Sequence, residues 1–128
     1  MQAIDTNVLV RFLTGDHPEQ SQKARAFVGG HDVFVATTVF LESEWVLRSV
    51  YDFSTTSICK AFRGFAGLAQ VTVENPTLLA QALDRAEAGM DFADALHLGA
   101  AAHCDAMVTF DRKFIKAAAG GPFDVIEP

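Results

Sequence analysis

Four acidic residues stand out because each falls where an apolar strand-like segment gives way to a helix-like one, or in the first turns of a helix. Asp5 follows residues 2–4, Glu42 and Asp94 lie early in two amphipathic segments, and Asp111 follows residues 106–109. In a parallel α/β sheet the carboxyl ends of the strands share one edge, where ligands bind. We therefore expect these acids to face one crevice.

The chemistry expected of such a group is that of a hard cation. Several carboxylates in one cleft repel each other, and a divalent ion with oxygen ligands relieves that repulsion. Oxygen donors favour Mg²⁺ or Mn²⁺ over zinc or copper. An ion of this kind can activate water and neutralise a phosphate, so the pattern indicates hydrolysis of a phosphate ester.

Each aspartate also has an ordinary structural explanation, which the sequence leaves open. Asp5 and Asp91 precede helical segments and could act as N-caps, and Asp111 could be a turn residue. Asp94 is favoured in a first helical turn by the helix dipole. His97, one turn further on among Ala and Leu, is expected to be packed.

Glu42 differs from its neighbour Glu44. Glu44 can pair with Arg48 four residues later on a solvated face, whereas no cation lies at helical spacing from Glu42. A carboxylate bordering an apolar stripe without a local partner is expected to find one elsewhere in the fold.

Strand-like and helix-like segments alternate along the whole chain. We expect strands at 2–4, 32–36, 70–73, 106–109 and 123–126, and helices at 7–13, 18–28, 37–50, 56–68, 76–88, 91–104 and 112–118. The expected helix starts include Pro18, a cap at Thr37 or Thr38, and a cap at Ser54 or Thr55; Gly29 and Gly30 are expected to end a helix. This order predicts an α/β fold with a parallel sheet covered on both faces, in one domain over residues 1–128.

Composition narrows the functional classes. The formal charge is −6 and the pI near 5.0, so overall charge would not hold a nucleic acid without a local basic patch or metal ions. Cys59 and Cys104 are isolated, and we expect both to be packed and reduced. Without a leader-like N-terminus or an apolar run of about 18 residues, the expected location is cytoplasmic.

Four blocks of this sequence together resemble the PIN-domain family, specifically the VapC-type toxin ribonucleases. They are residues 4–9 (IDTNVL), Glu42 with 45–48 (WVLR), 91–97 (DFADALH) and 108–114 (VTFDRKF). The resemblance covers nearly the whole chain in order, spacing and length.

This resemblance implies a Rossmann-like three-layer fold with five parallel strands and an endoribonuclease that uses Mg²⁺ or Mn²⁺. By position, Asp5 and Asp94 would be the principal metal ligands, with Glu42 and Asp111 completing an acidic quartet. The auxiliary groups would be Thr6, Asn7, Asp91 and Thr109. The implied partners are RNA, a VapB-type antitoxin and a second copy in a homodimer.

Two further sets of residues bear on partners. A basic rim near the acids could be formed by Arg11, Arg48, Arg112, Lys113 and Lys116. An apolar groove for an antitoxin tail, or plain core packing, could explain the aromatic residues Phe40, Trp45, Tyr51, Phe53, Phe62 and Phe65.

Three alternatives stay open at this level. A phosphatase of haloacid-dehalogenase type could use Asp5 as nucleophile, although such enzymes need a second Asp where this chain has Asn7. A scaffold protein could use the acids only as caps. DNA, as cut by flap nucleases of similar fold, could replace RNA as the substrate.

Overall fold

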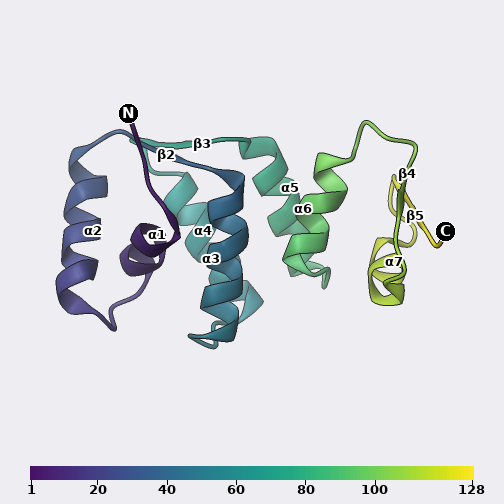
Figure 1. Ribbon diagram of the computed structural model, residues 1–128, viewed down its shortest axis with the longest axis horizontal. Coiled ribbons are helices and arrows are strands. Elements are labelled where there is room, and N and C mark those ends of the chain that lie inside the picture. The colour runs from purple at the N-terminus through teal and green to yellow at the C-terminus, as the bar shows by residue number, and fades with distance from the viewer. The chain divides into compact units, whose positions relative to one another are not determined.

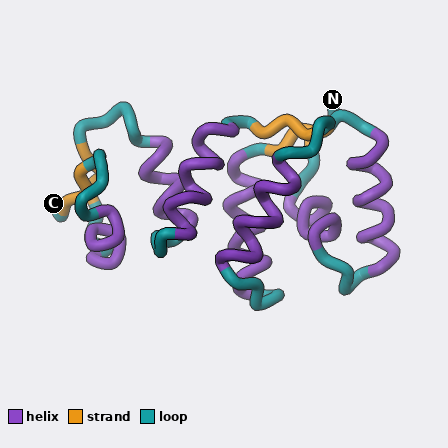
Figure 2. Tube along the Cα trace, turned by 180° about the vertical axis from the view of Figure 1, so that it is seen from behind, coloured by secondary structure: helices purple, strands orange, loops and turns teal.

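In the computed structural model, all 128 residues are described, and they form two compact units, Met1–Pro76 and Thr77–Pro128 (Figure 1). Parallel strands and seven helices alternate along the chain, which confirms the predicted α/β class. Helices dominate, and the strands are short (Figure 2).

The first unit contains a three-stranded parallel sheet in the order β1-β2-β3. Its elements are β1 (Gln2–Ala3), α1 (Thr6–Leu13), α2 (Pro18–Gly30), β2 (Val33–Val35), α3 (Thr37–Ser49), α4 (Thr55–Ala66) and β3 (Val71–Val73). Ala3 is in register with Phe34, and Phe34 with Thr72. The sheet therefore directs the ends of β1, β2 and β3 to one side.

The second unit contains a two-stranded parallel sheet, with Met107 in register with Val125. Its elements are α5 (Pro76–Glu87, which starts at the boundary), α6 (Phe92–Ala100), β4 (Ala106–Val108), α7 (Arg112–Ala118) and β5 (Asp124–Ile126). The structure thus pairs three strands and two strands in separate sheets, where one sheet of five was expected. Alternating patterns predict strands, but pairing depends on long-range contacts that no local pattern encodes.

Aromatic and aliphatic side chains of α3 and α4 form much of the first unit's core. Phe40 and Phe62 are fully buried and meet edge to face, with ring centroids 5.1 Å apart. Phe65 and Leu47 are buried as well. The core-packing interpretation is therefore confirmed for the three phenylalanines at 40, 62 and 65.

Several predicted helix starts are confirmed. Pro18 opens α2, and the Ser54 hydroxyl caps α4 by accepting a hydrogen bond from the Ser57 N–H at 3.1 Å. The prediction of a cap at Thr37 or Thr38 was wrong, because α3 starts after Ala36 without a side-chain cap of its own. The Thr37 N–H instead donates to the Glu74 carboxylate, 2.9 Å away.

Helix ends were predicted less well. Gly29 and Gly30 lie inside α2 rather than after it, because neither needs a positive φ there. The helix predicted for 91–104 ends at Ala100, where tighter bonds such as the Ala101 N–H to the Leu98 carbonyl close the last turn.

Two observations concern the remaining composition-based expectations. Cys59 is buried as predicted, but Cys104 is exposed, because the chain leaves α6 before reaching it. None of the helices combines the length and the apolar character needed to cross a membrane.

Candidate active site

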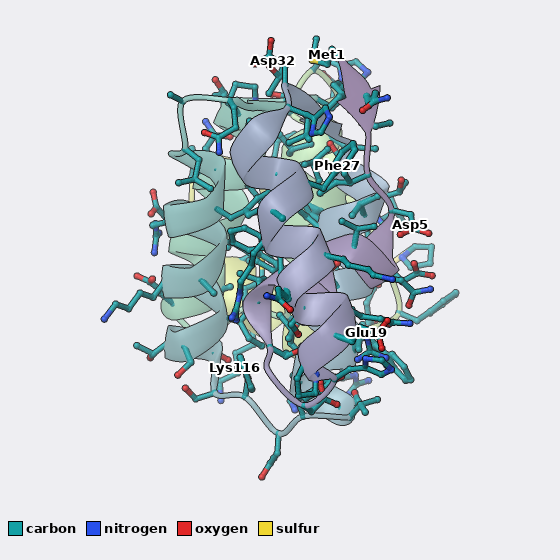
Figure 3. The ribbon with its side chains drawn as sticks, turned by 90° about the vertical axis from the view of Figure 1, so that its left-hand side faces the viewer. Met1, Asp5, Glu19, Phe27, Asp32 and Lys116 are labelled. Atoms are coloured by element: carbon teal, nitrogen blue, oxygen red, sulfur yellow. The ribbon has the colours of Figure 1, made fainter.

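Asp5 caps the helix that follows β1. Its Oδ1 accepts a hydrogen bond from the Val8 N–H at 3.1 Å, and the residue lies exposed on the surface of the first unit (Figure 3). The cap uses one of the two carboxylate oxygens of this exposed residue. The structural and the catalytic interpretations of Asp5 are therefore compatible.

Glu42 has the distant partner that its sequence context predicts. The Thr6 hydroxyl, at the start of α1, donates a hydrogen bond to Glu42 Oε1 on α3, although the two residues are 36 positions apart. The partner is a hydroxyl group rather than the counter-charge that was expected. This bond holds the Glu42 carboxylate beside the N-terminus of α1, next in sequence to Asp5.

Glu44 forms the predicted pair with Arg48, with Arg48 Nε 2.8 Å from Glu44 Oε2. The expectation that this face of α3 is solvated was wrong, because Glu44 is only 7% exposed. Its carboxylate lies on the buried side of the helix, next to Ser43, while Glu42 is exposed.

A groove of about 590 Å³ borders Asp5 in the first unit. Its walls come from β1, α1 and α2, and they include Val8 and Phe27 as apolar contacts and Arg11 and Lys23 as cations. Figure 3 shows Phe27 and Asp5 on the same side of the unit. Sequence reasoning missed Lys23 and Phe27, although their spacing of four on α2 puts them on one helix face.

The second unit holds the other acids, again at helix starts. Asp91 caps α6 through a bond from the Asp94 N–H, 3.2 Å from its Oδ2, as predicted. Asp111 caps α7, with its Oδ1 accepting from the N–H groups of Lys113 and Phe114 at 2.9 and 3.2 Å. The Thr109 hydroxyl accepts from the Asp111 N–H at 3.0 Å and so fixes the turn that presents Asp111.

Asp94 is the acid most affected by its surroundings. Burial raises the pKa of Asp94, and the negative charges of Asp91 and Asp111 raise it further, while His97 opposes them. His97 is exposed, so the expectation that it is packed was wrong; the α6 face beyond Asp94 is open to solvent at that position. The second unit therefore places three carboxylates close enough for their charges to interact.

The structure assembles the predicted site residues in two sets. Asp5, Thr6, Asn7 and Glu42 belong to the first unit, and Asp91, Asp94, Thr109 and Asp111 to the second. Neither unit by itself gathers three or more His, Cys, Asp or Glu side chains into a group that could hold a metal ion. Both sets offer oxygen donors only, which fits Mg²⁺ or Mn²⁺.

The predicted basic rim is partly neutralised within the chain. Arg11 contacts Asp16, Gln20 and Tyr51, and its Nη1 lies 3.4 Å from the Asp16 carboxylate. The hydrogen bond from Tyr51 lowers the pKa of Asp16. The other two arginines, Arg48 and Arg112, pair with Glu44 and Glu127.

Comparison with known protein families now identifies the fold. Residues 3–120 match the PIN domain, a stretch that runs through both units and contains Asp5, Glu42, Asp91, Asp94 and Asp111. The chain belongs to the PIN-domain family. PIN domains are typically metal-dependent nucleases that use Mg²⁺ or Mn²⁺, so membership assigns the chain at this level to the hydrolases. The prediction of a PIN domain is confirmed. No curated protein matches the chain.

Proposed function

We propose that this PIN domain is a metal-dependent endoribonuclease and the toxin of a VapBC-type toxin–antitoxin system. The observation that carries the proposal is the PIN match over residues 3–120, which contains four acids at strand ends and helix starts. The phosphatase alternative loses support because the family match concerns nucleases, and the scaffold alternative does not account for it.

In the proposed site Asp5 and Asp94 are the principal ligands of Mg²⁺ or Mn²⁺, and Glu42 and Asp111 complete the quartet. When bound, the ion would supply Lewis acidity toward water and toward a phosphodiester. The carboxylates would orient the attacking water and accept its proton. Thr6 would hold Glu42 in place, and Thr109 would hold Asp111. Asn7 and Asp91 would be auxiliary groups. The predicted basic rim would contact RNA phosphates.

We also propose that both units belong to one PIN domain over residues 1–128. The family match, which runs through both units, supports this proposal. One cooperative unfolding transition in calorimetry would support a single domain, and two separate transitions would contradict it.

The nuclease proposal is tested by incubating the purified protein with total cellular RNA and Mg²⁺ and mapping new 5′ ends. We expect discrete cuts that disappear with EDTA and return with added Mg²⁺ or Mn²⁺. A parallel incubation with single-stranded and flap DNA tests the DNA alternative. The proposal would be overturned if neither RNA nor DNA were cleaved in the presence of Mg²⁺ or Mn²⁺. It would also be overturned if the protein released phosphate from small esters and did not cleave nucleic acid.

The bond between Thr6 and Glu42 gives a prediction about orientation. Thr6→Val keeps the side-chain shape but removes the hydroxyl donor, so Glu42 loses its fixed position. Loss of a group that orients a metal ligand typically costs about 10- to 100-fold in activity. We expect a kcat reduction of that size in RNA cleavage, with Thr6→Ser close to wild type because serine retains the hydroxyl. Equal rates for Thr6→Val and wild type would show that this bond is dispensable.

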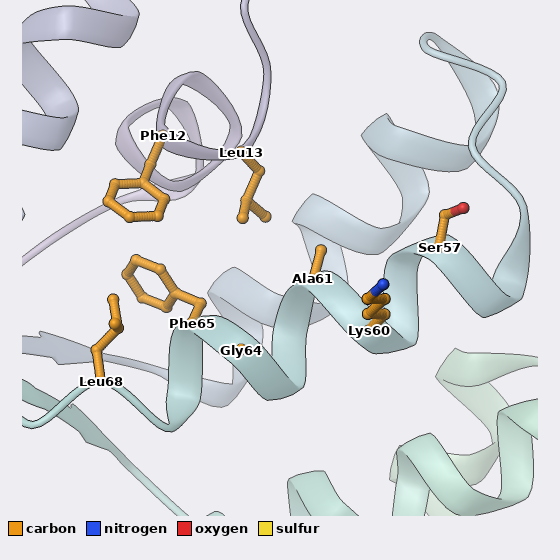
Figure 4. Close-up of a pocket in the computed structure, with 8 residues that line it drawn as sticks. All are labelled: Phe12, Leu13, Ser57, Lys60, Ala61, Gly64, Phe65 and Leu68. Atoms are coloured by element: carbon orange, nitrogen blue, oxygen red, sulfur yellow. The ribbon is translucent and has the colours of Figure 1, made fainter.

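The partners we propose are a VapB-type antitoxin and a second copy of the chain in a homodimer, in the cytoplasm. An apolar groove of about 420 Å³ between α1 and α4 in the first unit suits an apolar antitoxin segment (Figure 4). Phe12 and Phe65 are among the lining residues, with ring centroids 4.9 Å apart, although Phe65 itself is buried in the core. No neighbouring atom fills the space beside Gly64 on α4. Both partners are tested by co-expressing the chain with a VapB-type protein and measuring the mass of the resulting species by sedimentation. A monomeric chain that does not bind this protein would contradict both the antitoxin and the homodimer proposals.

A further inference from the structure

The helix that carries Glu42 is capped from a neighbouring strand of the sheet. Helix α3 starts after Ala36, which supplies no side-chain cap. The carboxylate of Glu74, which directly follows β3, accepts a hydrogen bond from the Thr37 N–H at 2.9 Å. The first N–H groups of a helix have no partner within it, so Glu74 supplies an acceptor that the residues before α3 do not.

The backbone of Glu74 is held in place because it continues the parallel ladder between β2 and β3. Val35 is in register with Val73, and the Glu74 N–H donates to the Val35 carbonyl at 3.0 Å. The Glu74 carboxylate therefore extends from a fixed backbone position and places its negative charge at the positive end of the α3 dipole. All of these residues belong to the first unit.

Glu42 links this contact to the proposed site. It lies five residues after Thr37, about 7.5 Å further along the helix axis, and its carboxylate accepts the hydrogen bond from the Thr6 hydroxyl. The edge-to-face contact of Phe40 with Phe62 holds α3 against α4, but it does not bond the start of α3 to the sheet. If the first turn of α3 frayed, Glu42 in the next turn would lose its fixed approach to Thr6.

We infer that Glu74 is a positioning residue for Glu42. By capping α3 from the end of β3, it keeps the Glu42 carboxylate on the Thr6 hydroxyl, beside Asp5 at the end of β1. Glu74 acts through Glu42 and is not itself assigned to the metal ion. The inference rests on the proposed ribonuclease function for its effect on cleavage, but its effect on Glu42 can be measured without RNA or metal.

The first measurement is NMR of the metal-free protein labelled with ¹³C and ¹⁵N. In Glu74→Ala the side-chain carboxyl resonance of Glu42 should move in the direction in which Thr6→Val moves it. The Thr37 amide hydrogen should exchange about five- to tenfold faster, because the helix start has lost its cap. Glu74→Gln keeps an acceptor oxygen and should resemble wild type in both measurements.

The second measurement is the rate of RNA cleavage. We expect Glu74→Ala to lower kcat about tenfold with KM nearly unchanged, the lower end of the effect of groups that orient a metal ligand. In a Thr6→Val background the same substitution should lower kcat by less than about twofold, because Glu42 has already lost its anchor. Glu74→Gln should cleave at close to the wild-type rate.

A matched control is Ser54→Ala, which removes the cap of α4 in the same unit. It should lower the melting temperature about as much as Glu74→Ala does, yet leave kcat and the Glu42 resonance unchanged well below that temperature.

Three results would overturn the inference while leaving the nuclease proposal intact. They are a wild-type Glu42 resonance in Glu74→Ala, an equal loss of kcat in Ser54→Ala, and a full tenfold loss when Glu74→Ala is added to Thr6→Val. Absence of RNA cleavage by wild type is the separate result that removes the proposed function. In that case the Glu42 resonance would still decide whether Glu74 positions Glu42.

Discussion

Replacing Asp5 by asparagine is expected to abolish RNA cleavage while leaving the fold intact. Asparagine is as good an N-cap as aspartate, so the bond from the Val8 N–H that starts α1 can be kept. The negative charge proposed to bind the metal ion is lost. Because loss of a mere orienting group costs about 10- to 100-fold, removing a principal ligand should cost more than 100-fold.

The measurement is kcat/KM on a labelled RNA at saturating Mg²⁺, together with the melting temperature. Asp32→Asn is a matched control, because Asp32 is another exposed acid in the first unit and lies before a strand rather than after one. It should cleave RNA at the wild-type rate. Cleavage by Asp5→Asn at that rate, with an unchanged fold, would remove Asp5 from the site.

The sequence predicted best those features that depend on neighbouring residues. Pro18 and Ser54 begin helices as expected. Helix α7 has the predicted bounds, because Asp111 caps it directly before Arg112. Capping acts over three or four residues, so a short pattern contains the whole interaction. The predicted cap of α3 was wrong for the opposite reason. The Thr37 N–H at the start of this helix donates to Glu74, which lies 37 positions away.

The faces of α3 show a second limit of local patterns. Helical spacing indicates that Glu42 and Trp45 share a side, but not whether that side is buried. Glu44 was expected in solvent and is buried, while Trp45, a candidate for the core, is exposed. Which face is covered depends on how α3 packs against α1 and α4, a property of the tertiary fold.

Whether the four acids of the predicted quartet act together also depends on long-range structure. The residues were selected by their positions after strands and at helix starts, and the structure places Asp5, Asp91 and Asp111 at helix caps. Local signals alone would assign them to capping. The interaction of Asp91 and Asp111 with Asp94 adds an electrostatic cost that capping does not need.

Asp94→Asn is expected to stabilise the metal-free protein and to abolish cleavage. Because burial and the charges of Asp91 and Asp111 raise the pKa of Asp94, ionised Asp94 destabilises the folded state relative to the unfolded one. The folded state binds the extra proton, so stability falls as pH rises from the ordinary value of 3.8 through the raised pKa. Above that window the full cost is present, and asparagine removes it.

Thermal unfolding of both proteins between pH 3 and 8, with and without Mg²⁺ or Mn²⁺, measures this effect. In EDTA the melting temperature of Asp94→Asn should exceed that of wild type at neutral pH, and the two should converge toward pH 3. Added metal should raise the melting temperature of wild type far more than that of the variant, because a ligand that binds the folded state stabilises it. Asp124→Asn, an exposed acid in the same unit, should follow wild type throughout. If repulsion between carboxylates destabilises the metal-free protein, removing the charge of Asp94 must raise the melting temperature in EDTA. A lower melting temperature for Asp94→Asn than for wild type in EDTA would therefore contradict the prediction and show that the Asp94 carboxylate stabilises the fold.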